Sequence, residues 1–237
     1  MVKTIIWFIY FGLYLLGTVP ALMKVKSLDQ QGRIQERDKI IHQTAQGWAK
    51  SLVNFTGAQI QVIGEENIPK EGSVLFVSNH QGNFDIPILL GFIDKPKAFI
   101  AKKELKKIPI LRTWMEYMQC VFIDRQDARQ SLKAINRGTE LLKEGYSQVI
   151  FPEGTRSEDG TIGEFKAGSL KLALKANVPI IPISIKGSYN MMPKGDWKIK
   201  AAKVEVIISP AVSTENVAVK ESNELTDRVR EIIAAKL

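Results

Sequence analysis

Seven short apolar runs, separated by segments with helical periodicity, follow one another from residue 59 toward the C-terminus. The runs are 59–63, 73–78, 97–101, 119–124, 148–151, 179–185 and 204–208. Several hold Val, Ile and Phe without polar alternation, which is typical of strands whose sheet is covered on both faces. Helices are expected at 86–92, 109–118, 127–144 (with Asp127 as N-cap), 168–176 and 219–237. The alternation predicts an α/β fold with a largely parallel central sheet flanked by helices.

The first 56 residues have a different character. The uncharged stretch 4–23 is barely long enough to span a bilayer, which needs roughly 20 residues, and Pro20 is expected to shorten its helix. A spanning anchor, a helix inserted in one leaflet and a cleaved signal peptide all remain open, although lysines directly after the stretch disfavour the last. A second helix is predicted at 28–55, either lying on a membrane or packed on the domain. We therefore expect a membrane-associated two-helix segment over 1–56 and an α/β domain over 57–237.

The composition narrows the possible partners. The chain of 237 residues has a formal net charge of +8, which implies attraction to something acidic. Nucleic acid is disfavoured because the lysines are not interleaved with aromatic residues, whereas anionic lipids, phosphorylated substrates and an acidic carrier protein remain open. A single cysteine, Cys120, excludes an internal disulfide framework, and its apolar surroundings predict a core residue.

His80 and Asp85 follow the predicted strand 73–78 directly. Histidine is the side chain that can serve as a base near neutral pH, and a carboxylate can fix its tautomer and stabilise its charged form. The position also fits, because open α/β sheets usually place their chemistry beyond the carboxyl ends of their strands. The alternative is that Asp85 only caps the next helix while His80 is a loop residue. In an ideal helix residues five apart lie on different faces, so the pair meets only if 81–84 form a turn.

Three further strand ends project charged groups: Lys102, the pair Asp124–Arg125, and the segment Phe151–Ser157. If these ends converge near His80 they form a cationic pocket, and the planar fork of arginine suits phosphate. Within Phe151–Ser157, Gly154 would let a ligand approach the backbone closely. Each element also has a plain structural explanation as a solvated ion pair, a turn or a charged surface.

The complete set resembles the lysophosphatidate acyltransferase family. His80 and Asp85 match its first motif, Phe122–Arg125 its second, and Phe151–Ser157 its third, residue for residue. Val178–Pro182 match the apolar fourth motif, and order and approximate spacing agree over roughly 60–210. The N-terminal helices resemble the membrane-binding helical pair of bacterial members, but that region carries no motif.

The resemblance implies transfer of a fatty acyl group from acyl-carrier protein or coenzyme A to the sn-2 hydroxyl of 1-acylglycerol 3-phosphate, forming phosphatidic acid. It makes His80 the general base and Asp85 the residue that orients it. The substrate-binding residues would be Arg125 and Arg156 for the phosphate, Lys102 as a weaker candidate, Glu153 for the acceptor, and Gly154 and Thr155 in the same segment. Backbone N–H groups around Gly154 are the expected oxyanion donors. No metal or cofactor is required.

Other functions stay open beside this one. A sister acyltransferase acting on glycerol 3-phosphate or another lysolipid would share the motifs, and a non-catalytic membrane-anchored phospholipid binder would share the pocket. A serine hydrolase is disfavoured because no G-x-S-x-G motif is present. The expected location is the cytoplasmic face of the inner (plasma) membrane, with membrane lipids and an acyl thioester as partners and no nucleic acid. Segment 191–198, which contains Trp197, is a second membrane contact, a lid or a surface loop.

Overall fold

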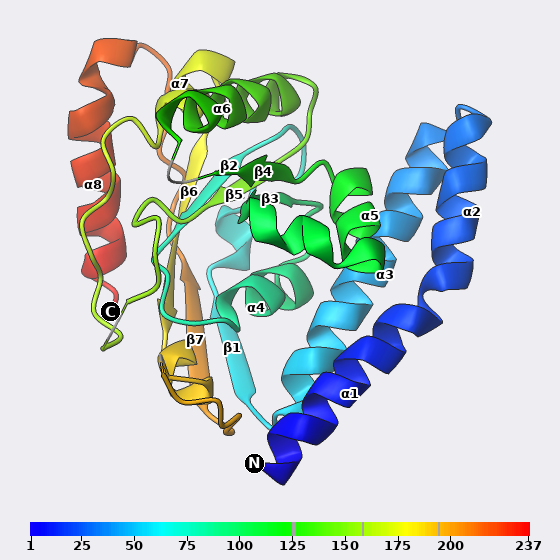
Figure 1. The fold of residues 1–237 in the computed structure, drawn as a ribbon. Coiled ribbons are helices and arrows are strands. Elements are labelled where there is room, and N and C mark those ends of the chain that lie inside the picture. Colours follow the sequence, from blue (N-terminus) through cyan, green and yellow to red (C-terminus); the bar gives the residue numbers. More distant parts are fainter. Residues whose placement is uncertain (125–126, 158, 194) are drawn as a thin grey trace.

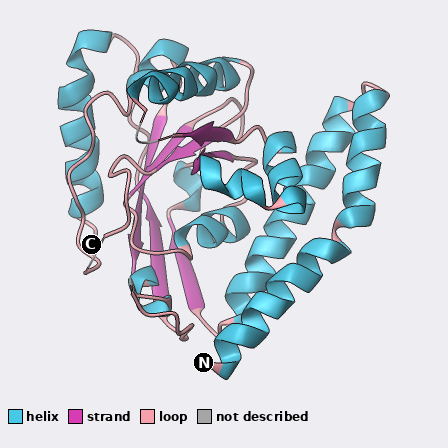
Figure 2. Ribbon diagram, in the orientation of Figure 1, coloured by secondary structure: helices cyan, strands magenta, loops and turns pink. Residues whose placement is uncertain are grey.

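The computed structural model describes residues 1–124, 127–157, 159–193 and 195–237. Within them the strands are β1 (Gln59–Ile63), β2 (Leu75–Ser78), β3 (Ala98–Lys102), β4 (Val121–Ile123), β5 (Gln148–Ile150), β6 (Ile180–Lys186) and β7 (Lys203–Ile208). They form one seven-stranded sheet in the order β1-β7-β6-β2-β5-β3-β4. The sheet runs through the middle of the molecule with helices on both sides (Figures 1 and 2).

The direction of the strands places the carboxyl ends of five neighbours at one edge. β6, β2, β5, β3 and β4 are parallel to one another, while β7 is antiparallel to β6 and parallel to β1. The predicted α/β fold with a largely parallel sheet is therefore confirmed. At that edge His80 and Asp85 follow β2, Glu153–Arg156 follow β5, and Lys102 is the last residue of β3.

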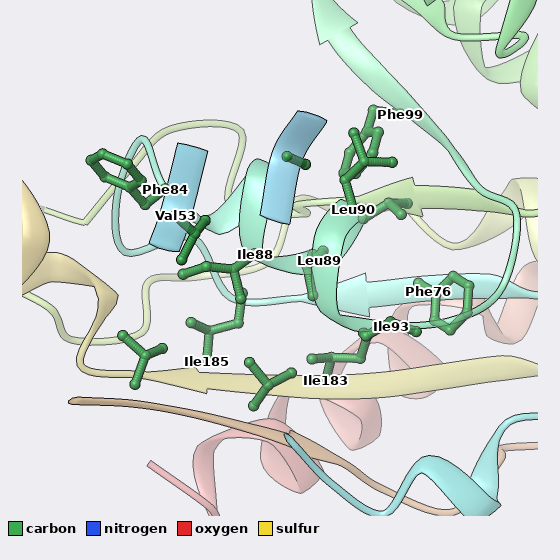
Figure 3. Close-up of a cluster of buried hydrophobic side chains, with 14 of the residues drawn as sticks. Val53, Phe76, Phe84, Ile88, Leu89, Leu90, Ile93, Phe99, Ile183 and Ile185 are labelled. Carbon is green, nitrogen blue, oxygen red and sulfur yellow. The ribbon is translucent and has the colours of Figure 1, made fainter. Parts of the chain in front are cut away.

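Helices cover the two faces of the sheet with separate apolar cores. The helices of the α/β part are α4 (Asp85–Phe92), α5 (Pro109–Tyr117), α6 (Ala128–Lys143), α7 (Lys171–Ala176) and α8 (Ser222–Ala234). α6, α7 and α8 cover one face, and α4 covers the other together with the N-terminal helices. Neighbouring residues of β5 show the alternation, since Val149 belongs to the α4 core and Ile150 to the α6–α8 core. Figure 3 shows Ile88 and Leu89 of α4 packed over Ile183 and Ile185 of β6.

Residues 1–56 form three helices instead of the two that were predicted: α1 (Val2–Gly17), α2 (Val19–Gln30) and α3 (Ile34–Phe55). Pro20 lies in the first turn of α2. A helix leaves its first N–H groups unpaired, so proline costs nothing there and the chain continues as a helix to Gln30. Taken together, Val2–Gln30 are long and apolar enough to cross a membrane by length and composition, and only 17% of their most apolar window is buried.

α3 is packed on the α/β part, as one of the two interpretations of this helix expects, and contact of its other face with a membrane stays a prediction. Its residues Ala49, Leu52 and Val53 are fully buried in the core that includes α4. The two helices touch at the backbone, because a Cβ atom added at Gly91 of α4 would lie 2.7 Å from the backbone nitrogen of Lys50. α1 is joined to α3 by the indole of Trp7, which donates to the carbonyl of Leu52 at 2.9 Å.

The outward face of α1 is apolar. Its exposed side chains include Ile5, Ile6, Phe8, Ile9, Leu13 and Leu16. Singly exposed apolar residues are ordinary, but a continuous apolar stripe along one helix marks a surface that contacts lipid or protein.

Candidate active site

His80 and Asp85 meet beyond the end of β2. The chain turns through 81–84, and the His80 Nδ1 atom lies 2.7 Å from Asp85 Oδ2. Asp85 is fully buried and His80 is 9% exposed. Asp85 is the first residue of α4 and not its N-cap, which is Phe84. The structure thus forms the predicted pair, and the catalytic role of the two residues stays a prediction.

Both oxygens of the Asp85 carboxylate have protein donors. Oδ2 accepts from the Gly82 N–H at 2.8 Å as well as from the His80 ring. Oδ1 accepts from the hydroxyl of Ser188, which is buried at the start of the turn after β6. A buried carboxylate is costly unless its oxygens are hydrogen-bonded. These contacts allow Asp85 to stay in place without solvent.

The third-motif segment holds His80 from several sides. The imidazole stacks on the ring of Phe151, with centroids 4.2 Å apart and an interplanar angle of 20°. The His80 N–H donates to Glu153 Oε1 at 2.7 Å, and its carbonyl accepts from the Ser157 N–H at 2.8 Å. Both the ring and the backbone of His80 are therefore fixed by residues that follow β5.

Glu153 is a buried carboxylate bonded to two backbone groups. Besides the His80 N–H it accepts from the Gly163 N–H at 2.9 Å, through Oε2. Burial raises the pKa of Glu153, and the two backbone N–H bonds oppose that shift. Glu153 therefore ties the His80 loop to the loop at Gly163.

The predicted cationic residues are more open. Arg156 is half-buried, and its Nη1 donates to Asn83 Oδ1 at 2.6 Å, so it reaches the loop between His80 and Asp85. Thr155 and Lys102 are both exposed. Lys102 lies at the end of β3, and in the sheet β5 lies between β3 and the His80 strand, β2. Arg125 lies outside the described residues.

Gly154 lies in a turn after β5, and the oxyanion role of the N–H groups around it stays a prediction. Its φ of +70° is in the left-handed region that favours glycine, and its N–H donates to the Phe151 carbonyl at 3.0 Å. That N–H is therefore taken within the turn. A Cβ atom at Gly154 would also lie 2.8 Å from Nζ of Lys166, so the lysine side chain crosses the glycine closely.

Two cavities that share part of their walls lie between the N-terminal helices and the His80 loop. The apolar cavity, about 260 Å³, is lined by residues such as Leu52, Leu90 and Trp114 of α3, α4 and α5. The outer cavity, about 520 Å³, is lined by Phe8, Arg156 and others. The two share Trp7, Phe11, Asn83, Pro87 and Leu105. An anionic group at Arg156 and a hydrocarbon chain in the apolar cavity would therefore sit on either side of Asn83.

Segment 191–197 is partly core and partly surface. Met191 is fully buried, whereas Trp197 is 73% exposed and lines the outer cavity beside Phe8 of α1. The predicted lid and membrane contact both remain compatible with this position.

Residues 59–186 match the family described as Acyltransferase, which is more than half of the chain. The chain belongs to the acyltransferase family. It is 32% identical to a protein of Mycoplasma genitalium named "Probable 1-acyl-sn-glycerol-3-phosphate acyltransferase", over 96% of this chain and 87% of that protein. It is 33% identical to the 1-acyl-sn-glycerol-3-phosphate acyltransferase of Pseudomonas aeruginosa, over 77% and 72% respectively.

A solved structure shows the same fold. The crystal structure of the 1-acyl-sn-glycerophosphate (LPA) acyltransferase PlsC from Thermotoga maritima superposes with a TM-score of 0.88 and 31% identity, covering 99% of this chain and 93% of that one. The agreement therefore includes the N-terminal helices of this acyltransferase as well as its α/β part.

Sequence reasoning missed three polar residues of the acyltransferase site, Asn79, Gln81 and Ser188. The Asn79 side chain exchanges two hydrogen bonds with the backbone of Ile185, at 2.8 and 2.9 Å. Gln81 accepts from the Gly187 N–H at 3.0 Å. All three residues connect the His80 loop to β6 or to the turn that follows it. A usable signal was the pair of amide side chains flanking His80.

Two other features bear on the chemistry. Burial raises the pKa of the Cys120 thiol to about 12, so Cys120 in the wall of the apolar cavity is not a thiolate nucleophile. Across the part of the chain that the structure describes, no group of three or more His, Cys, Asp or Glu side chains could hold a metal ion.

Proposed function

We infer that this acyltransferase transfers a fatty acyl group from an acyl thioester to the sn-2 hydroxyl of 1-acylglycerol 3-phosphate, forming phosphatidic acid. The observation that carries this inference is the buried 2.7 Å contact between His80 and Asp85, placed one loop away from the guanidinium of Arg156. A base and a phosphate-binding group so arranged match an acceptor that bears both a hydroxyl and a phosphate. The names of the relatives agree with it.

The chemistry follows from the hydrogen bond at Nδ1. A carboxylate only accepts, so Nδ1 carries the proton and the lone pair of His80 lies on Nε2. In the proposed reaction Nε2 takes the hydroxyl proton while the oxygen attacks the thioester carbon. The imidazolium, stabilised by Asp85, then gives that proton to the departing thiolate. We propose that no metal ion or cofactor takes part, because the thioester already carries an activated acyl group.

We propose that Arg156, Arg125 and Lys102 bind the acceptor phosphate. Support comes from Arg156, whose guanidinium lines the outer cavity and reaches the His80 loop through Asn83. An arginine can donate two parallel hydrogen bonds to phosphate oxygens, and such bonds between charged groups are about twice as strong as neutral ones.

The apolar cavity is the proposed site of a hydrocarbon chain. Its lining is almost wholly apolar, and it shares Asn83 with the outer cavity, which Arg156 lines. Burial of each CH₂ group contributes about 0.8 kcal/mol, so a chain gains much more there than the short glycerol 3-phosphate could. This supports a lysolipid acceptor over glycerol 3-phosphate.

The apolar N-terminal helix indicates membrane association. We propose that α1 lies in one leaflet on the cytoplasmic side, with its outward stripe in the lipid and its inner face lining both cavities. A lysolipid would then enter from the bilayer, while acyl-carrier protein or coenzyme A would deliver the acyl group from the cytoplasm. The net charge of +8 favours anionic lipid and acidic donors alike.

A matrix of acceptors and donors tests the proposal. Purified protein in vesicles is given lysophosphatidic acid, glycerol 3-phosphate or lysophosphatidylcholine, each with acyl-carrier-protein and acyl-coenzyme A donors, and products are read by mass. Phosphatidic acid from lysophosphatidic acid is the expected main product with at least one donor. Preferential acylation of glycerol 3-phosphate, or no acyl transfer to any acceptor, would overturn the proposal.

A further inference from the structure

Ser188 contacts the catalytic pair from a distant part of the chain. It follows β6, the neighbour of β2 in the sheet, and its hydroxyl donates to Asp85 Oδ1 across 103 positions of sequence. Ser188 is 1% exposed and Asp85 is fully buried. This contact therefore forms away from solvent and joins two different strand ends.

We propose that Ser188 is a positioning residue for this reaction: its hydroxyl holds the Asp85 carboxylate in the orientation that His80 requires. The inference rests on the proposed function, since it assigns Ser188 a part in the same proton transfer. Ser188 does not touch the reacting atoms itself.

The single hydroxyl proton of Ser188 is directed at Asp85. The other acceptor within reach, Gln81 Oε1, is 3.4 Å away and already accepts from the Gly187 N–H. The contact with the Asp85 carboxylate is much shorter. A hydrogen bond to a charged oxygen is about twice as strong as one to a neutral oxygen, so the carboxylate takes the proton.

The bond fixes the plane of the carboxylate. Oδ2 is held by the Gly82 N–H and faces the His80 ring, whereas Oδ1 accepts from the Ser188 hydroxyl. With both oxygens held by different loops, the carboxylate cannot rotate about its last bond. Removing the hydroxyl leaves a buried charged oxygen without this donor and lets the group turn away from Nδ1.

A series of substitutions at Ser188 tests the proposal. Ser188→Ala should lower kcat about 10- to 100-fold, as expected for loss of one hydrogen bond to a charged group, with the KM for lysophosphatidic acid near that of the parent. Ser188→Thr, which keeps the hydroxyl, should recover most of the lost kcat. Ser188→Cys, which keeps the size but donates weakly, should not.

Ser184→Ala is the matched control. Ser184 is another fully buried serine, on β6 itself, and its hydroxyl donates to the Ile233 carbonyl on the other side of the sheet at 2.9 Å. This variant loses a buried hydroxyl without touching Asp85, so it should keep the parent kcat. An equal loss of kcat in both alanine variants would show that stability and not positioning explains Ser188.

A double-mutant cycle separates action through Asp85 from an independent effect. In an Asp85→Ala background, Ser188→Ala should cause no further loss of kcat, because the group it holds is absent. If the fold-losses in kcat of the two single variants multiply in the double variant, the proposal is overturned. An unchanged kcat in Ser188→Ala would also overturn it. If Ser188→Ala does not fold, the proposal is tested by comparing kcat of Ser188→Thr with kcat of Ser188→Cys. Equal kcat values in these two variants would contradict the proposal. Failure of the parent to acylate any lysolipid would refute the proposed function instead.

Discussion

The His80 loop and the cationic residues beside it differ in how far the protein itself fixes them. His80 and Asp85 are buried, and ring, backbone and carboxylate all have protein partners. Arg156 is half-buried with a bond to Asn83, and Lys102 is exposed. A group that is already in place needs no reorganisation during the reaction, whereas an open cation can close on an anion when it arrives. The difference teaches that substitutions in the loop should affect turnover and those among the cations should affect acceptor binding.

The largest effect is expected for His80→Ala. Loss of a general base typically costs about 10²- to 10⁴-fold in rate, so acyl transfer to lysophosphatidic acid should fall at least that far. Product mass and vesicle flotation are measured together, and membrane binding should be unchanged.

His42→Ala is the control for that variant. His42 is the other histidine of the chain and lies 3.0 Å from the exposed Asp94, away from the site. It should retain the activity of the parent. Substantial activity in His80→Ala would contradict the assignment of the base and with it the contrast between the two regions.

Arg156→Ala tests the cationic side. Loss of a hydrogen bond between charged groups is worth about 1.5–3 kcal/mol, so the KM for lysophosphatidic acid should rise about 10- to 100-fold with a smaller change in kcat. Steady-state kinetics with the acceptor varied gives both constants. Arg112→Ala removes an exposed guanidinium of α5 that pairs with Glu116 and should change neither. If Arg156→Ala lowers kcat and leaves the KM unchanged, Arg156 acts in turnover like the residues of the His80 loop and not in acceptor binding.

Ile9→Lys extends the comparison to the open apolar stripe of α1. Ile9 is 56% exposed, and burial of such a side chain in lipid contributes about 1.5–3 kcal/mol. Vesicle affinity should therefore fall about tenfold or more, while activity on detergent-dispersed substrate persists. Leu132→Lys on α6, where the leucine is 59% exposed, should leave vesicle affinity unchanged. Equal losses in the two variants would show that α1 is not a specific membrane surface.

A prediction on stability, with no effect expected on activity, concerns the buried Lys97 beyond the C-terminus of α4, whose Nζ donates to the Ile93 carbonyl at 2.7 Å. Burial lowers the pKa of Lys97 from 10.5 to about 7. Between these values the unfolded chain binds one more proton than the folded one, so the stability of the parent rises with pH. Lys97→Met lacks this titrating group, so its unfolding free energy does not gain this increase. The unfolding free energy of the variant minus that of the parent should therefore fall by about 1.4 kcal/mol per pH unit over this window. Denaturant unfolding at pH 7 and 9.5 measures it, and a pH-independent difference would contradict the shift.

Much of the fold could be predicted because the strands are short runs of β-branched residues between clear turn signals. The Asp127 cap is an example, since its carboxylate accepts from the N–H groups of Arg129 and Gln130 at 2.8 and 3.1 Å, as its place before the helix predicted. Pro20 was expected to shorten the helix of the apolar stretch, and α1 does end at Gly17, but a new helix starts at Val19 with Pro20 in its first turn. A proline inside a helix breaks it, and the same residue in the first turn does not.

The site was predictable only where the residues are close in sequence. His80 and Asp85 are five positions apart, so their meeting required one turn. Ser188 reaches Asp85 only because β6 and β2 are neighbours in the sheet. The order of strands in a sheet cannot be predicted from local sequence patterns. The antiparallel direction of β7 escaped prediction for the same reason.

The close approach of α3 and α4 at Gly91 has a mechanical consequence. α4 begins with Asp85, and α3 is tied through Leu52 to Trp7 of α1. With no side chain between the two backbones, α1, α3 and the Asp85 carboxylate belong to one stiff frame. In the proposed membrane-bound state, the depth of α1 in the lipid would therefore set the height of the reacting hydroxyl above the hydrocarbon.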